Sequence, residues 1–199
     1  MNQYDYIEAG LRVFGLYGAD KNGNCECGNP DCKAAYKHPR LSNWQHTPQW
    51  SDDQLEVMDE MGQFKTGFGV LVSGLLVIDV DARHGGVASY ERLCALLPAI
   101  KDAGFVVKTG SGGGSCHVYF SLPLVVPMVQ THKEFQGIDF KTSGFVVGAG
   151  SLHASGNTYE AIHGHPDDIT PAPAALVELL RKPDLHRATR SEERRVGKE

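Results

Sequence analysis

Two aspartates spaced two residues apart, Asp79 and Asp81, end an apolar run that begins at Leu75. A short apolar run of this kind is typical of a buried β-strand. Alternate residues of a strand share a face, so both carboxylates point to one side while Ile78 and Val80 point to the other. Two close carboxylates repel each other unless a cation compensates them. The pair predicts a divalent metal site, although an aspartate that only opens the following turn would produce the same local pattern.

The same pattern recurs twice downstream. His117 and Tyr119 share one face of the predicted strand 116–120, and Asp139 and Lys141 share one face of the predicted strand 137–141. Carboxylate oxygens suit Mg²⁺ or Mn²⁺, and a lysine and a histidine beside them suit a phosphate group. Three acids, a histidine and a lysine on one sheet face therefore predict a combined metal and phosphate site.

A glycine-rich segment, residues 109–115, leads directly into the strand that carries His117. Glycines allow backbone amides to approach an anion closely, so the segment is a candidate phosphate-binding loop. It is not a P-loop, because no Gly-Lys-Ser/Thr follows and the next element has the pattern of a strand. The alternative is an ordinary flexible hairpin tip.

Three cysteines and a histidine form the pattern C-x-C-x4-C-x5-H at Cys25, Cys27, Cys32 and His38. Thiolates and an imidazole suit tetrahedral zinc. They lie in residues 20–49, a long segment without helical or strand periodicity that needs an internal constraint to be ordered. We predict a structural zinc site here. Free thiols in a reducing compartment are the alternative, and His46 is an alternative fourth ligand.

The elements that must position these residues alternate between helical and strand patterns, which predicts an α+β fold. The stripe from Tyr4 to Tyr17 predicts a helix, and Ser51 is the expected N-cap of a second helix that buries Leu55, Met58 and Met61. The residues Ser73-Gly74 predict a hairpin between apolar runs 67–72 and 75–80. Further predicted helices start at residues 86 and 171, and further strands cover residues 105–108, 145–147 and 158–162.

The 199 residues carry a formal net charge of −5, which disfavours a broad electrostatic contact with nucleic acid. No apolar run is long enough to span a bilayer and no leader pattern opens the chain, so we expect a cytoplasmic protein with no membrane contact. Residues 1–182 are expected to form one domain. Residues 183–199 have no apolar stripe, resemble appended rather than native sequence, and are expected to be disordered.

Taken together, these motifs resemble the N-terminal domain of bifunctional DNA primase/polymerases (prim-pol), in the archaeo-eukaryotic primase superfamily. The resemblance covers residues 5–182 and rests on segments 37–40, 77–81 with 84–86, 109–114, 117–120, 137–141 and 151–156 with Tyr159. Such domains occur in replication proteins of phages, plasmids and other mobile elements.

The resemblance implies a catalytic core with an RRM-like, mixed or antiparallel sheet beside a smaller N-terminal α/β part that carries a zinc-knuckle-like insertion. It implies that Asp79, Asp81 and Asp139 bind Mg²⁺ or Mn²⁺ and that His117 contacts the triphosphate of the incoming nucleotide. The implied nucleotide-binding residues are Ser111, Gly112, Gly113, His117, Lys141 and Ser151. The implied partners are a DNA template and primer, a dNTP or NTP, and a helicase domain or protein.

The activity expected from this resemblance is template-directed nucleotidyl transfer by a two-metal mechanism. Two other functions use the same residues. A metal-dependent nucleotide hydrolase or phosphoesterase would use the three acids without a template, and a zinc-stabilised nucleic-acid-binding module would use the cysteine segment without catalysis.

Overall fold

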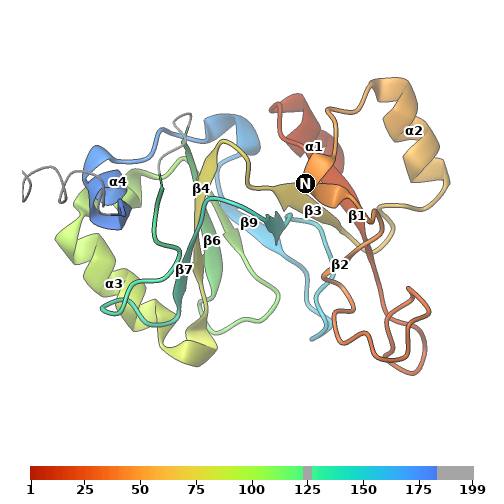
Figure 1. Cartoon of the computed structure of the whole chain (residues 1–199), viewed down its shortest axis with the longest axis horizontal. Helices are drawn as coiled ribbons and strands as arrows, with labels where there is room; N and C mark the ends of the chain where they lie inside the picture. Colours follow the sequence, from red (N-terminus) through yellow and green to blue (C-terminus); the bar gives the residue numbers. More distant parts are fainter. Residues whose placement is uncertain (123–126, 183–199) are drawn as a thin grey trace, which may run out of the picture.

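The computed structural model describes residues 1–122 and 127–182, which form two antiparallel β-sheets and several helices (Figure 1). The α-helices are α1 (Gln3–Glu8), α2 (Asp52–Glu60), α3 (Gly86–Leu96) and α4 (Ala174–Leu180). The strands are β1 (Val13–Tyr17), β2 (His38–Pro39), β3 (Phe68–Leu71), β4 (Leu75–Val80), β5 (Phe105–Lys108), β6 (Cys116–Ser121), β7 (Ile138–Lys141), β8 (Phe145–Val147) and β9 (Glu160–His163). The predicted α+β class is confirmed.

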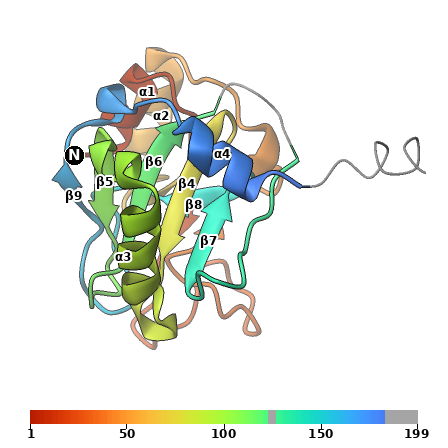
Figure 2. The ribbon, with the colours of Figure 1, turned by 90° about the vertical axis from the view of Figure 1, so that its left-hand side faces the viewer.

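The larger sheet has the strand order β7-β4-β6-β5-β9, and α3 and α4 cover one of its faces (Figure 2). Alternate residues of β4 supply the contact with these helices, because a strand directs every second side chain to the same face. The core between sheet and helices includes Leu76, Ile78 and Val80 of β4, Leu93 of α3 and Leu176 of α4, all fully buried.

The opposite face of this sheet packs against the smaller sheet, which lies with α1 and α2 on the other side of the molecule (Figure 1). Val77 of β4 and Tyr119 of β6 share one apolar cluster with Phe14 of β1 and Phe68 of β3. Asp79 follows Val77 on the same face of β4 and is only partly buried. The polar residues predicted to do chemistry therefore lie at the rim of the core that joins the two sheets.

The smaller sheet has the order β2-β1-β3-β8, so its last strand comes from the second half of the chain. β8 pairs with β3 through Val146 opposite Val70. The smaller α/β part expected at the N-terminus is consequently completed by a segment that follows all the strands bearing the candidate site residues.

The helix predicted from Tyr4 to Tyr17 is wrong beyond its first turns. Asn2 caps α1 with a reciprocal contact to Asp5, but the helix ends at Glu8 and is followed by Gly10, where φ is +78°. Residues 13–17 then form β1, which lies between β2 and β3. Because this strand is buried on both faces, it lacks the alternating pattern that would have distinguished it from a helical stripe.

The predicted hairpin through Ser73-Gly74 is also wrong, although both of its strands exist. β3 pairs with β1 and β8, whereas β4 pairs with β6 and β7, so the short connection crosses from one sheet to the other. Both strands are almost entirely buried and each has a neighbour on both edges. Tertiary pairing has overridden the local turn signal.

The helix predicted to start at Ser51 is confirmed as α2. The Ser51 hydroxyl accepts a hydrogen bond from the Gln54 N–H, and the Gln54 side chain accepts one from the Ser51 N–H. Leu55 is fully buried as predicted, but Met61 lies after the helix and is 69% exposed, so the predicted apolar stripe is one turn too long.

None of the described helices is long and apolar enough to cross a membrane. The predicted disordered tail, residues 183–199, lies outside the described residues.

Candidate active site and cysteine cluster

Three neighbouring strands bring Asp79, His117 and Asp139 together. β4 lies between β6 and β7, and the register places Asp79 opposite His117 on one side and opposite Asp139 on the other. Directly opposed residues of antiparallel strands point to the same face with Cβ atoms about 4.5–5.5 Å apart. The strand order of the sheet thus unites three side chains that are far apart in the sequence.

Lys141 lies between the two aspartates of the neighbouring strands. Its Nζ is 3.7 Å from a carboxylate oxygen of Asp79 and 3.6 Å from one of Asp139. The His117 Nε2 is 3.6 Å from the other oxygen of Asp79. The ammonium group therefore offsets the repulsion between the two carboxylates in the protein alone.

Asp81 follows β4 and makes local contacts. Its carboxylate accepts two hydrogen bonds from the Arg83 guanidinium, at 3.0 and 2.8 Å, and lies 3.0 Å from the His84 Nδ1. The Arg83 contact is the main reason why the pKa of this carboxyl lies well below its usual range, with His84 adding to the effect. Asp81 is thus ionised and already paired with a cation at neutral pH.

His117 is 4% exposed, and its Nδ1 makes no hydrogen bond within the described residues. Burial lowers the pKa of His117 to about 4, against an opposing effect of Asp79. Its ring lies 5.8 Å from the Tyr159 ring and 6.3 Å from the Tyr119 ring, centroid to centroid. In the protein alone His117 is therefore a neutral imidazole held in an aromatic setting.

The glycine-rich loop 109–115 is ordered by the facing loop 151–157. The Gly110 carbonyl accepts hydrogen bonds from the Ser155 hydroxyl at 2.7 Å and from the Asn157 side-chain amide at 3.1 Å. Gly110 packs so closely on His153 that a Cβ at this position would overlap the histidine. The loop is consequently docked on the body of the protein rather than free at a hairpin tip.

A cavity that opens over Asp79 and Asp81, here called the main cavity, is lined by Ser111. Gly112 and Gly113, the other predicted nucleotide-binding residues of this loop, do not line it. Gly112 and Gly113 have φ values of +73° and +65°, which L side chains rarely adopt. The Ser111 hydroxyl lies 2.6 Å from the Thr109 hydroxyl. The two glycines thus shape the turn that presents Ser111.

Ser151, also predicted to bind nucleotide, lies away from the cavity. It is fully buried, and its hydroxyl accepts a hydrogen bond from the Phe68 N–H at 3.0 Å. This contact ties the loop after β8 to the start of β3. Its sequence neighbours His153 and Tyr159 line the cavity instead.

The main cavity has a volume of about 420 Å³ and opens over the paired aspartates. It brings together all three predicted acids with His117 and Ser111, while Lys141 lines an adjoining smaller cavity that shares Lys37, Asp79, His117 and Tyr159 with it. Several further lining residues were not predicted as site residues, namely Lys37, Arg83, His84, Thr109, His153 and Tyr159. All of them except Arg83 lie in segments that were singled out in the sequence, but nothing local separates a lining side chain from its neighbours.

The donor atoms around this cavity suit a hard divalent cation, because they are carboxylate oxygens on one sheet face. Lys141 already occupies the position of a compensating charge between Asp79 and Asp139. Within the described residues the three carboxylates do not form a group of close ligand atoms, and Asp81 is turned toward Arg83. The chemistry of the site fits Mg²⁺ or Mn²⁺ if the cation displaces these internal partners.

Comparison with known families gives a match over residues 3–175 to the Prim-Pol family, described as the N-terminal domain of bifunctional DNA primase/polymerase. The chain belongs to this family. Membership confirms the resemblance seen in the sequence and implies primase or polymerase activity in general, with nucleic acid and nucleotides as substrates. A search of curated proteins finds no match.

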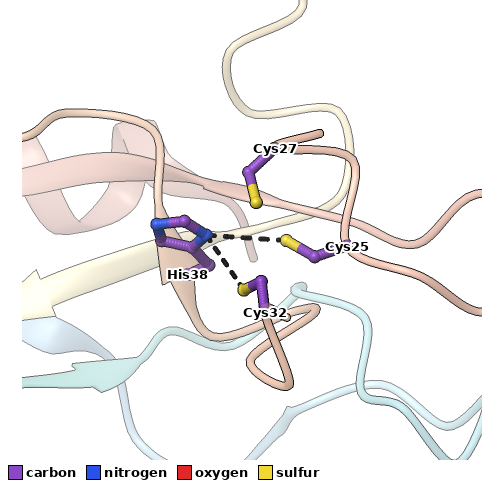
Figure 3. Close-up of side chains that lie close together, drawn as sticks. All are labelled: Cys25, Cys27, Cys32 and His38. Atoms are coloured by element: carbon purple, nitrogen blue, oxygen red, sulfur yellow. Dashed lines mark hydrogen bonds between the residues drawn. The ribbon is translucent and has the colours of Figure 1, made fainter. Parts of the chain in front are cut away.

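This Prim-Pol chain also carries the predicted cysteine cluster. Cys25, Cys27, Cys32 and His38 place one ligand atom each within 4.8 Å of all the others (Figure 3). The His38 Nδ1 lies 3.6 Å from the Cys25 Sγ and 3.3 Å from the Cys32 Sγ. His46, the alternative fourth ligand, is exposed and is not part of the group.

These separations fit zinc. With Zn–S and Zn–N bonds of about 2.3 and 2.0 Å, a tetrahedral ion separates a sulfur from a nitrogen ligand by about 3.5 Å. Backbone hydrogen bonding from Asn29 lowers the pKa of the Cys27 thiol, while burial raises the pKa of Cys25 to about 11. A cation at the centre would favour the thiolate form of both. The four side chains could therefore hold a structural zinc ion.

The basic segment 37–40 divides its side chains between two roles. Arg40 donates to the Leu16 carbonyl, pairs with Glu26 at 3.3 Å and stacks over the Tyr17 ring. It is part of the support of the cysteine segment and is not free to contact a phosphate. Lys37, by contrast, lines the main cavity.

Proposed function

We propose that this chain catalyses template-directed nucleotidyl transfer from dNTPs or NTPs at the cavity above β4, β6 and β7. The observation that carries the proposal is the register of Asp79 with both His117 and Asp139 in a cavity faced by the docked glycine loop. A fold of the archaeo-eukaryotic primase type, with the larger sheet as its RRM-like core, and a role in replicating a phage, plasmid or other mobile element are part of the same proposal.

Asp79, Asp81 and Asp139 would hold two Mg²⁺ or Mn²⁺ ions. When bound, these ions would lower the pKa of the primer 3′-hydroxyl and neutralise negative charge on the triphosphate. The aspartates fix the positions at which the primer end and the nucleotide meet, which accounts for much of the rate enhancement in such reactions.

The remaining residues would orient the triphosphate. Ser111, presented by the turn at Gly112 and Gly113, can donate its hydroxyl hydrogen to a phosphate oxygen, and neutral His117 can donate from a ring nitrogen. Lys141 supplies a positive charge where negative charge develops on the leaving diphosphate. Ser151 supports the site from below by holding the start of β3 rather than by touching nucleotide.

The test is extension of a labelled primer on a template, with Mn²⁺ or Mg²⁺ and with dNTPs or NTPs in turn. We expect template-directed extension by the wild-type chain and a loss of at least about 10³-fold in the Asp79→Asn/Asp81→Asn double variant, because positioning and charge neutralisation fail together. Asp102→Asn, an exposed aspartate outside both cavities, is the matched control and should extend normally.

Metal-dependent nucleotide breakdown without extension, lost in the same double variant, would keep the site and assign it to a hydrolase. Nucleic-acid binding that depends on Cys27 but not on the aspartates, with no turnover, would instead support a binding module.

A further inference from the structure

Lys37 lies between the cysteine cluster and the active-site cavity. It directly precedes His38, whose Nδ1 faces the thiols. Its own side chain lines both the main cavity and the adjoining one, together with Asp79 and His117. A candidate zinc ligand and a residue of the candidate nucleotide site are thus consecutive in the chain.

The backbone around Lys37 explains this arrangement. Tyr36 has φ +66°, the one positive value at a non-glycine position in the described part of the chain. Its N–H donates to the Tyr17 carbonyl, and His38 then pairs with Tyr17 in β2. Lys37 ends the turn that precedes β2 and lines the cavity, whereas His38, the first residue of β2, faces the cysteines. A strained residue at this point is held by its surroundings rather than by local preference.

The charges in the cavity leave Lys37 available for a ligand. Lys141 is paired with Asp79 and Asp139, and Arg83 is paired with Asp81. Across residues 1–122 and 127–182, Lys37 makes no ion pair, although its charge is close enough to lower the pKa values of His117 and His153. An unpaired ammonium group beside a phosphate-binding loop suits a polyanion.

We propose that zinc at the cysteine cluster fixes the position of Lys37 so that its ammonium group binds the triphosphate of the incoming nucleotide. Zinc occupancy would then set nucleotide affinity, through His38 and the adjoining peptide, without any contact between zinc and nucleotide. The inference rests on the proposed function, because it takes the nucleotide site to be the cavity above β4.

The first arm of the test measures equilibrium binding of dATP and dAMP, with Mg²⁺ present, together with zinc content. Lys37→Met should keep its zinc and weaken dATP binding by about tenfold, as expected for loss of one charge-assisted contact, while dAMP binding changes little. Lys37→Arg should restore most of the dATP affinity. Lys33→Met, an exposed lysine of the same segment that lines neither cavity, should behave as wild type.

The second arm removes zinc, either with a zinc-selective chelator in excess Mg²⁺ or by Cys27→Ser. Zinc removal should weaken dATP binding by about as much as Lys37→Met does, and the two changes together should be far from additive because they act on one contact. Hydrogen exchange in the strands of the larger sheet is the control for folding. If zinc removal leaves this exchange unchanged, the fold persists without zinc.

The outcomes separate the inference from the function on which it rests. If Lys37→Met binds dATP as tightly as the wild-type chain does, the role of Lys37 is overturned. The same holds if Lys37→Met weakens the binding of dATP and of dAMP equally. Additive effects of zinc removal and Lys37→Met overturn the coupling. A wild-type chain that binds dATP with no dependence on Asp79 or Asp81 contradicts the proposed function itself.

Discussion

Arg83 contacts the carboxylate of Asp81 and would therefore compete with the metal ion that we propose Asp81 binds. The contact is bidentate, and Arg83 is largely exposed, so it can swing away when a cation or a phosphate arrives. Because the pair lowers the pKa of Asp81, it stabilises the folded state at every pH above the ordinary pKa of an aspartate. This contribution is lost as the pH falls from the ordinary pKa through the lowered one.

Replacing Arg83 by glutamine should tighten Mn²⁺ binding in the absence of nucleotide, because the competing cation is gone. Exposed ion pairs contribute little to stability, so we expect a gain in Mn²⁺ affinity of up to about fivefold and little change in the free energy of unfolding. Titration of Mn²⁺ by its electron paramagnetic resonance signal measures the affinity directly.

Arg181→Gln is the matched control, since Arg181 forms an exposed pair with Glu178 outside both cavities. It should leave Mn²⁺ affinity unchanged. Weaker Mn²⁺ binding in Arg83→Gln would mean that Arg83 orients Asp81 for the metal rather than competing with it.

At the scale of elements, two loops line the side of the cavity at which we propose that the nucleotide binds. The glycine loop 109–115 is closed by internal backbone hydrogen bonds such as Thr109 N–H to the Ser115 carbonyl, and Ser155 and Asn157 donate hydrogen bonds to its Gly110 carbonyl. The absence of a side chain at Gly110 allows this docking, because His153 fills the adjacent space. The two loops form one unit although they are distant in sequence.

Gly110→Ala should therefore separate the loops. We expect faster hydrogen exchange in 109–115 and 153–157 with the sheets unaffected, and weaker dATP binding, since Ser111 loses its fixed position. Overpacking of this kind costs about 1–3 kcal/mol where the surroundings cannot move. Exchange measured by mass spectrometry, with dATP titration, tests both effects.

Gly156→Ala separates the steric effect from backbone strain. Gly156 has φ +87° but open space around its Cα, so the change introduces strain of about 1–2 kcal/mol without a clash. Equal loss of dATP affinity in the two variants would contradict the role assigned to the Gly110 contact.

At the scale of the whole molecule, the two sheets share one apolar cluster, which includes residues of β1, β3, β4, β5 and β6. Both tryptophans, Trp44 and Trp50, pack against this cluster. Their fluorescence reports on the side with the smaller sheet, while far-UV circular dichroism reports on all elements. A shared core makes independent unfolding of the two sheets unfavourable, as expected if residues 1–182 are one domain.

Leu76→Ala tests this cooperativity. Leu76 is fully buried on the other face of the larger sheet, against the helices, and its truncation should cost about 2–5 kcal/mol. In denaturant unfolding, the fluorescence and circular dichroism midpoints should shift together and by the same amount. A shift in circular dichroism alone would show that the sheets unfold as separate units.

The sequence alone determined those features that depend on local periodicity and donor chemistry. Within each strand, alternation identified the face that carries Asp79, His117 or Asp139 and the apolar residues behind it, and the capping pattern at Ser51 identified the start of α2. The cysteine spacing identified three ligands and left the fourth open between His38 and His46, and the structure brings Cys25, Cys27, Cys32 and His38 within 4.8 Å. These features follow from bonds and angles within a few residues.

Only the tertiary structure decided which strands are neighbours and hence which side chains meet. It converted residues 13–17 into a strand and sent β3 and β4 to different sheets, because long-range pairing and burial outweigh weak local signals. It buried Ser151 as a backbone anchor and brought Lys37 and Tyr159 to the cavity, which no local pattern distinguishes from their neighbours. Side-chain placement relative to a site depends on packing between segments that are remote in the chain, and so appears only when the whole fold is present.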